Sequence, residues 1–316
     1  METTTATQPI CSVCSREAPQ PLLICFNCSE GTDSDGKISL TNYCGTRCRD
    51  GDDSNHAGIC KLKNNRKALY RAGEILQAAF YIWREVAFDI NIESVWKNEE
   101  GILCYREREY DSGVTLYRFP DHLIPDSRDK VKILSFIACT DAQTHMFELS
   151  KRLLEGLVTN PCELTVTVDP ECLTVHRYYD WGLDQETFDH EVIEVVLGGD
   201  SEASEGYVID MAGAQHGQFK AVVPSRSYIP DCAERAVRRK GLQIVWAANV
   251  EMRKRMKVAM DDWEREACCT VQLLPRCRMR KYEEGKATLL ARIRGALEQY
   301  VDELEVSEKR SSSGNG

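Results

Sequence analysis

The sequence lacks the features of a secreted, membrane-spanning or repetitive chain. The first nine residues, METTTATQP, are polar and contain no apolar stretch of the kind found in a signal peptide. No run of about 18 apolar residues occurs, so we expect no transmembrane helix. No internal repeat is visible, which excludes a solenoid. We therefore expect an intracellular globular protein, with a nuclear or a cytoplasmic location left open.

The chain also lacks an excess of positive charge. The 316 residues carry a formal net charge of −10 at pH 7, and the pI is about 5.3. Residues 1–62 contain eight acidic and five basic side chains, so the N-terminal segment is acidic too. Because the phosphate backbone of nucleic acid attracts basic surfaces, this balance argues against a nucleic-acid partner.

Cysteine, in contrast, is abundant and unevenly placed. The chain has 15 cysteines, an odd number, and seven of them lie with one histidine in the first 60 residues. These eight residues form four closely spaced pairs: Cys11 and Cys14, Cys25 and Cys28, Cys44 and Cys48, His56 and Cys60. Without a secretion signal, such a cluster favours metal sites in a reducing compartment over a disulfide framework.

The spacing of the four pairs suits zinc. Two cysteines separated by two residues can reach one ion from a single tight turn, and ligands at i and i+4 lie on one face of a helix. Eight such ligands make two tetrahedral sites with no open position, which indicates structural rather than catalytic zinc. A segment this short with few large apolar side chains needs metal to fold. Spacing alone permits either sequential or interleaved use of the pairs.

The eight ligands resemble the MYND-type zinc finger. They match all eight ligand positions of that family in order, over residues 11–60, and Tyr43 matches the aromatic residue before the fifth ligand. The resemblance implies two interleaved zinc ions. It assigns the ligands of the first ion as Cys11, Cys14, Cys44 and Cys48, and those of the second as Cys25, Cys28, His56 and Cys60.

The resemblance also implies a role in protein–protein interaction. MYND fingers bind protein partners, and several take short proline-containing peptides into a surface groove. This sequence departs from the family's groove, where Gln follows the sixth ligand, Trp precedes the histidine by three residues and Lys follows it. Here those positions hold Arg49, Asp53 and Ala57. We expect a protein or peptide partner other than a proline-containing peptide; a partner that prefers an acidic surface, or no partner at this groove, is left open.

After residue 62 the pattern changes to that of an α+β domain. Eight apolar side chains in 66–90 recur at steps of mostly three and four, which predicts an amphipathic helix. The remaining expected elements are a strand, turn and strand over 102–119, one or two helices over 127–158, strands at 163–168, 190–197 and 207–210, and helices at 233–266 and 279–304. We therefore predict a finger at 1–62, a helix-rich body with a small, mainly antiparallel sheet at 63–305, and a disordered tail at 306–316.

One segment of the body is distinctive. The stretch GYVIDMAGAQHG at 206–217, followed by AVVP at 221–224, resembles a segment in the C-terminal bodies of fungal MYND-finger proteins. The Asn-His-Ser motif and terminal cysteine triplet of SET methyltransferases are missing, so we expect no methyltransferase.

The body also contains a possible catalytic series. Papain- and transglutaminase-like enzymes use a cysteine at a helix start, then a histidine on a strand, then an acid on the next strand. Cys139, His190 and Asp210 occur in this order, and Gln215 offers a further polar donor. Against this function, Cys139 falls inside a predicted helical pattern, where a buried cysteine acts as a small hydrophobic residue. We expect an adaptor or regulatory protein, and keep an acyl-transfer enzyme, or a degenerate version of that fold used for binding, as the alternative.

Overall fold

The computed structural model describes most of the chain. The described residues are 9–18, 21–108, 116–168, 170–184, 189–198, 204–228, 233–240 and 250–313. Within them, no helix has both the length and the apolar character needed to cross a membrane.

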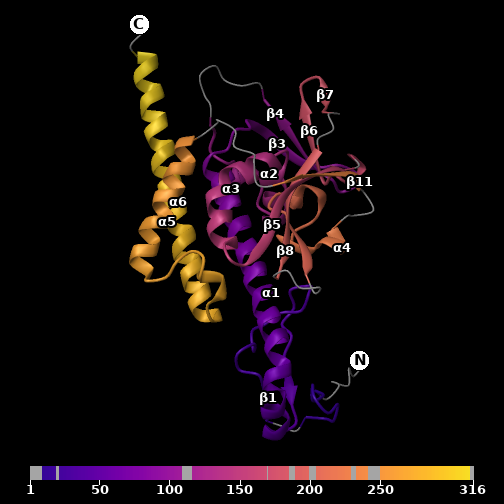
Figure 1. Cartoon of the computed structure of the whole chain (residues 1–316). Helices are drawn as coiled ribbons and strands as arrows, with labels where there is room; N and C mark the ends of the chain where they lie inside the picture. Colours follow the sequence, from indigo (N-terminus) through magenta and orange to yellow (C-terminus); the bar gives the residue numbers. More distant parts are fainter. Residues whose placement is uncertain are drawn as a thin grey trace.

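A single long helix, α1 (Thr46–Val86), connects the N-terminal segment to the body (Figure 1). Its second half is the helix expected from the pattern in 66–90, and residues such as Leu69, Leu76 and Phe80 are fully buried there. Its first half is mostly solvent-exposed and therefore carries no apolar repeat. For this reason the sequence pattern revealed only the buried part, and the helix begins 20 residues earlier and runs through the predicted boundary at residue 62.

The secondary structure confirms the α+β class. The helices of the body, besides α1, are α2 (Ser127–Ser135), α3 (Cys139–Leu154), α4 (Ser225–Tyr228), α5 (Val250–Ala267) and α6 (Met279–Ser313). Short 3-10 turns are η1 (Asp121–Leu123), η2 (Pro170–Cys172), η3 (Gly213–His216) and η4 (Leu274–Arg276). The strands are β1 (Leu23–Ile24), β2 (Asn42–Tyr43), β3 (Ile92–Lys97), β4 (Leu103–Glu107), β5 (Val158–Val168), β6 (Val175–Tyr179), β7 (Gly182–Leu183), β8 (Asp189–Leu197), β9 (Glu205–Ile209), β10 (Val222–Pro224) and β11 (Ala233–Lys240).

The strands form three sheets. The largest has the order β10-β9-β8-β5-β11, and all its neighbouring strands are antiparallel. A four-stranded sheet has the order β3-β4-β6-β7, in which only β4 and β6 are parallel. The two-stranded sheet of β1 and β2 belongs to the N-terminal segment.

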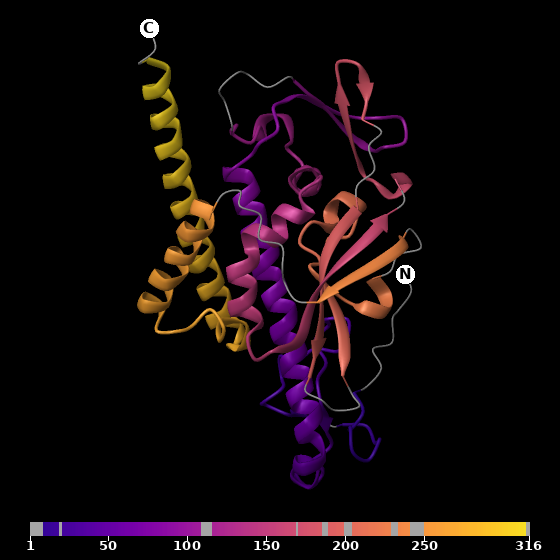
Figure 2. The ribbon, with the colours of Figure 1, turned by 45° about the horizontal axis from the view of Figure 1, so that its top comes forward.

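Helices α1 and α3 lie between the five-stranded sheet and the α5–α6 pair (Figure 2). One apolar cluster runs through these layers and includes Phe80 of α1, Met146 of α3, Val195 of β8 and Met260 of α5. Gly73 of α1 faces β10 so closely that an added Cβ would collide with the Val222 side chain. Glycine at this position therefore permits the close approach of helix and strand.

The predicted helix at 233–266 is wrong over its first eight residues. These residues form β11, whose backbone pairs with β5 from Ala233 opposite Val168 to Lys240 opposite Cys162. Helix α5 begins at Val250, and residues 241–249 lie outside the described part. The basic and alanine residues of this stretch favour a helix locally, but the free edge of β5 supplies a ladder of backbone hydrogen bonds that overrides this preference.

The predicted strand, turn and strand over 102–119 are confirmed only for the first strand. Strand β4 matches its first strand, but β4 pairs with β3 and β6, while Tyr117 forms an isolated bridge with Phe88. The predicted turn at 111–113 lies outside the described residues. At the other end of the chain, α6 continues through 306–313 of the segment predicted to be a tail, and residues 314–316 are not described.

Candidate metal centre

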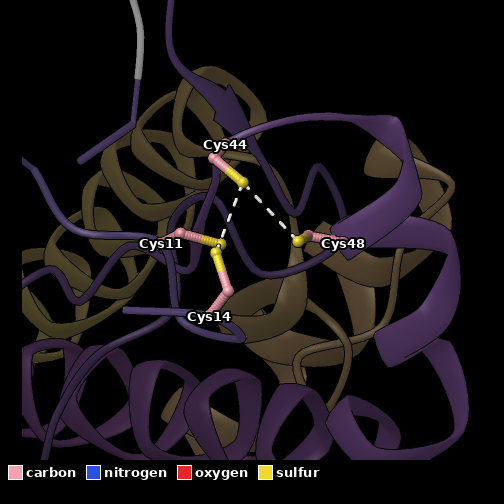
Figure 3. A group of neighbouring side chains, drawn as sticks. All are labelled: Cys11, Cys14, Cys44 and Cys48. Carbon is pink, nitrogen blue, oxygen red and sulfur yellow. Dashed lines mark hydrogen bonds between the residues drawn. The ribbon is translucent and has the colours of Figure 1, made fainter. Parts of the chain in front are cut away.

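The first ligand group comprises Cys11, Cys14, Cys44 and Cys48, whose sulfur atoms all lie within 4.8 Å of one another (Figure 3). The Cys14–Cys44 and Cys44–Cys48 sulfur pairs are each 3.5 Å apart. A zinc tetrahedron with bonds of 2.3 Å has sulfur–sulfur edges of about 3.8 Å. The observed spacing therefore fits four thiolates around one zinc ion.

Local backbone geometry positions these four cysteines. Cys11 and Cys14 share a tight turn closed by the hydrogen bond from Ser15 N to the Cys11 carbonyl, with Ser15 in the left-handed region at φ 59°. Cys44 directly follows β2, and Cys48 lies in the first turn of α1. The turn at Cys11–Cys14, the end of β2 and the first turn of α1 thus each contribute ligands to the same metal position.

The second ligand group comprises Cys25, Cys28, His56 and Cys60, whose donor atoms also lie within 4.8 Å of one another. His56 Nε2 lies 3.3 Å from the Cys28 sulfur, close to the edge of about 3.6 Å expected for one sulfur and one imidazole on zinc. Cys28 and His56 are buried. Tyr43 packs its ring edge-on against His56 and donates a hydrogen bond from its hydroxyl to Asp52 at 3.1 Å.

The two groups are interleaved along the chain. The sequence spacing left sequential and interleaved pairings open, and the structure has the interleaved one, as the MYND resemblance implied. The short β1–β2 ladder is antiparallel, so Cys25 and Cys44, which each directly follow one of its strands, lie at opposite ends of the ladder and in different groups. None of the seven cysteines forms a disulfide.

These donor sets can each hold one metal ion. Thiolate and imidazole donors in groups of four are typical of structural zinc, and each group fills all four tetrahedral positions. Such a site leaves no position for a substrate or an activated water. Metal binding at such a site instead stabilises the fold, since the surrounding segment has little apolar core of its own.

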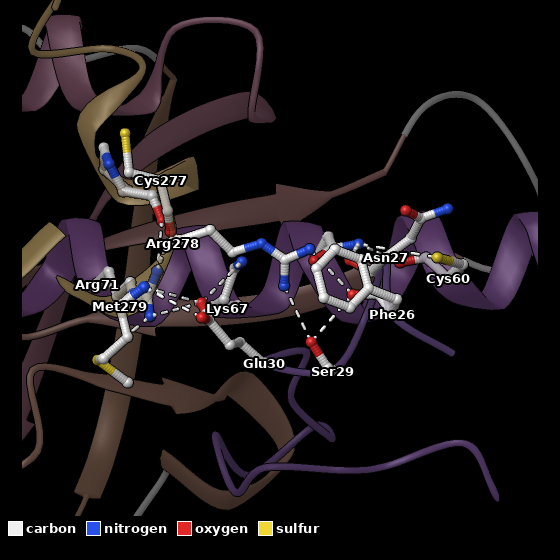
Figure 4. A network of polar contacts seen from close by, with 12 residues as sticks. Phe26, Asn27, Ser29, Glu30, Cys60, Lys67, Arg71, Cys277, Arg278 and Met279 are labelled. Atoms are coloured by element: carbon white, nitrogen blue, oxygen red, sulfur yellow. Dashed lines mark hydrogen bonds and ion pairs between the residues drawn. The ribbon is translucent and has the colours of Figure 1, made fainter. Parts of the chain in front are cut away.

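A polar network around Glu30 connects the N-terminal segment to the body (Figure 4). The Glu30 carboxylate accepts a hydrogen bond from the backbone N–H of Met279 at 3.1 Å, and lies 3.7 Å from Lys67 and 3.3 Å from Arg71. Beside it, Arg278 stacks over the Phe26 ring and donates to the Phe26 carbonyl. The network joins the loop after the second ligand pair to α1 and to the start of α6.

We predict that Glu30→Gln destabilises the folded chain by about 1 to 3 kcal/mol, because it removes the counter-charge of two buried cations. Lys67 and Arg71 are each only 6% exposed. The free energy of unfolding would be measured by urea denaturation of the zinc-loaded protein. Asp50→Asn, which removes an exposed carboxylate paired with Arg49, is the matched control and should change it by less than about 0.5 kcal/mol. If the two substitutions lower the free energy of unfolding equally, the network does not stabilise the packing of the N-terminal segment against the body.

The structure also brings Cys139, His190 and Asp210 together. His190 Nε2 lies 3.1 Å from Asp210 Oδ2, and the Cys139 thiol lies 3.7 Å from the carbonyl oxygen of Asp189, the residue before His190. The expectation that Cys139 lies inside a helix is wrong, because it is the first residue of α3. Sequence reasoning missed Tyr228, whose hydroxyl donates to Asp210 at 2.7 Å, since no local spacing connects residues 18 positions apart.

No family model, no curated protein and no solved structure matches this chain.

Proposed function

We propose that this chain is a zinc-binding protein-interaction protein, with an adaptor or regulatory role, whose residues 1–62 form a MYND-type finger. The observation that carries the proposal is the pair of interleaved, closed ligand groups. Zinc ions with four protein ligands perform no chemistry of their own, so their use is to hold a surface in shape.

The surface of the finger supports a partner-binding role. Of the 13 large hydrophobic side chains exposed among the described residues, six belong to this one-fifth of the chain. They are Ile10, Val13, Phe26, Ile38, Leu40 and Ile59. Apolar side chains that remain exposed on a small metal-held module favour contact with another protein.

The charge of the finger suggests the chemistry of the partner. Asp53 and Ala57 are exposed on the first turns of α1, at positions where the MYND groove has its aromatic and its lysine. The finger has more acidic than basic side chains. We infer a protein or peptide partner that combines apolar contacts with basic side chains, rather than a proline-rich peptide held against an aromatic wall.

The proposal is tested by photo-crosslinking in cells. A photoreactive amino acid replaces Ile59 in the finger or, as the matched control, Val258 on α5. The two side chains are equally exposed, at 54% and 55%. We expect a discrete protein adduct from position 59, none from position 258, and loss of the first adduct when His56→Ala is added. Adducts from position 258 alone, or an adduct at 59 that survives loss of the zinc ligand, would place the interaction elsewhere.

A further inference from the structure

The start of α3 has an unusual backbone. The helical pattern over 127–158 breaks into α2 and α3, and Ile137 lies between them with φ 53°. A β-branched residue in the left-handed region is strained, and such strain persists where the surrounding structure enforces it. Here the strained residue places Cys139 at the first position of a 16-residue helix, where the N–H groups of the first turn have no partner within the helix.

Side chains from two neighbouring segments, the end of β9 and the η3 turn, contact the His190 ring. His190 lies on β8 and is buried. Its Nε2 lies 3.1 Å from Oδ2 of Asp210, the residue that directly follows β9. Asp210 Oδ2 also accepts from the Tyr228 hydroxyl, and Oδ1 accepts from the backbone N–H of Ala212 at 3.1 Å. Gly213 passes so close that an added Cβ would collide with this carboxylate. The carboxylate is therefore fixed in position and directed at the ring.

Gln215 connects the strained turn to the imidazole. Its Oε1 accepts from the backbone N–H of Ile137 at 3.0 Å, and its Nε2 donates to the Ala212 carbonyl at 3.2 Å. These two backbone partners fix which end of the amide faces His190. The same Nε2 lies 3.3 Å from His190 Nδ1, the ring nitrogen that does not contact Asp210.

A small cavity lies over the thiol. It has a volume of about 40 Å³ and is lined by Cys139, His190, Gln215, Arg177 and Asp189 among others. This space holds molecules of water size or the tip of a narrow group. His190 also lines a second cavity of about 240 Å³, together with Asp210, His216 and Tyr228.

We propose that Cys139, His190 and Asp210 form an acyl-transfer site that accepts the tip of an unbranched primary carboxamide, such as a glutaminyl side chain. Cys139 is the nucleophile, His190 the general base and acid, and Asp210 a positioning residue. The size of the cavity over the thiol limits the substrate to a narrow group, and a nucleophile at a helix start places its own backbone N–H beside the developing oxyanion.

The electrostatics of the site support these roles. Burial disfavours the charged ring of His190, but the adjacent Asp210 carboxylate outweighs burial and raises the pKa of His190 to about 10. The thiol of Cys139 contributes in the same direction. Burial, followed by the charge of His190, lowers the pKa of the neighbouring His216 to about 3. His190 is thus the ring that carries charge in this pair of histidines.

The reaction proceeds in two balanced steps. The Cys139 sulfur, whose proton His190 already holds, attacks the amide carbon; His190 gives that proton to the leaving nitrogen, the C–N bond breaks, and ammonia departs from a thioester. In the second step, water or a primary amine attacks the thioester carbon and gives a proton to His190. The C–S bond breaks, and His190 keeps this proton beside the restored sulfur. The products are a carboxylic acid or a new amide.

The test uses iodoacetamide, a small electrophile with a primary carboxamide, on the full zinc-loaded chain. Peptide mass spectrometry at pH 6.5 gives the alkylation rates of Cys139 and of the exposed Cys268. We expect Cys139 to react at least tenfold faster than Cys268 despite its burial, and His190→Asn to slow Cys139 about 100-fold without changing Cys268. A Cys139 that reacts no faster than Cys268, or equally fast in both proteins, would overturn the proposal.

A second measurement does not depend on the folding of the His190 variant. The ultraviolet absorbance of thiolate at 240 nm at pH 6.5 is compared between the unmodified chain and Cys139→Ala, with the buried Cys104→Ala as the matched control. The zinc-bound thiolates contribute equally to all three proteins. We expect absorbance to be lost in Cys139→Ala and retained in Cys104→Ala; no loss in Cys139→Ala would overturn the assignment.

Discussion

Replacing His56 with alanine is expected to release one of two zinc ions and to unfold the finger, while the body remains folded. His56 is buried and completes the second ligand group with Cys25, Cys28 and Cys60. A structural zinc contributes on the order of 10 kcal/mol to the folding of such a segment, more than its small core supplies. The half of α1 that carries Leu69, Leu76 and Phe80 is buried in the body and needs no metal.

Two measurements check this result. Native mass spectrometry counts the zinc ions, and hydrogen exchange reports which backbone amides lose protection. The expected pattern is loss of protection over residues 11–60 with retained protection in β5, β8 and α6. His122→Ala, which changes a histidine on the exposed part of the chain, is the control and should keep both ions. A His56→Ala protein with two zinc ions and a protected finger would contradict the ligand assignment.

The second large effect is expected from Phe80→Ala, which should destabilise the body by about 3 to 5 kcal/mol. Phe80 is fully buried near the C-terminal end of α1 and stacks on Trp83 with ring centroids 6.2 Å apart. Removing its ring leaves a cavity between α1 and its neighbours in the main apolar cluster. Urea denaturation of the zinc-loaded chain measures the loss.

The matched control for Phe80→Ala is Ile59→Ala on the same helix. Ile59 is 54% exposed, so its truncation should change the free energy of unfolding by less than about 0.5 kcal/mol. Both variants should retain two zinc ions under native conditions, because neither side chain is a ligand. A Phe80→Ala protein as stable as the Ile59→Ala protein would show that this part of α1 does not pack into the main apolar cluster.

The metal ligands were predictable from sequence because their chemistry is local. Each pair reaches its ion from one turn or one helix face, so the spacing within a pair is visible in the chain. The partition of the pairs between two ions is set by β1 and β2, which meet across about 18 residues, and spacing alone did not determine it. The MYND resemblance supplied that partition, and the structure has it.

Features that depend on distant partners were not predictable. Glu30 is an ordinary surface residue in sequence, and its role arises from Lys67, Arg71 and the start of α6 more than 240 residues later. The helix start at Cys139 depends on the left-handed conformation of Ile137, which a β-branched residue gives no reason to expect. Strand β11 likewise depends on the edge of β5 and contradicts the local helix preference.

The metal content of the purified 316-residue chain tests the two-zinc assignment most directly. Native mass spectrometry is combined with hydrogen exchange before and after treatment with a zinc chelator. We expect two zinc ions per chain and a finger that loses protection over residues 11–60 as both ions are removed. A chain that carries no zinc, yet keeps these residues protected, would contradict the claim that two closed zinc sites hold the N-terminal segment.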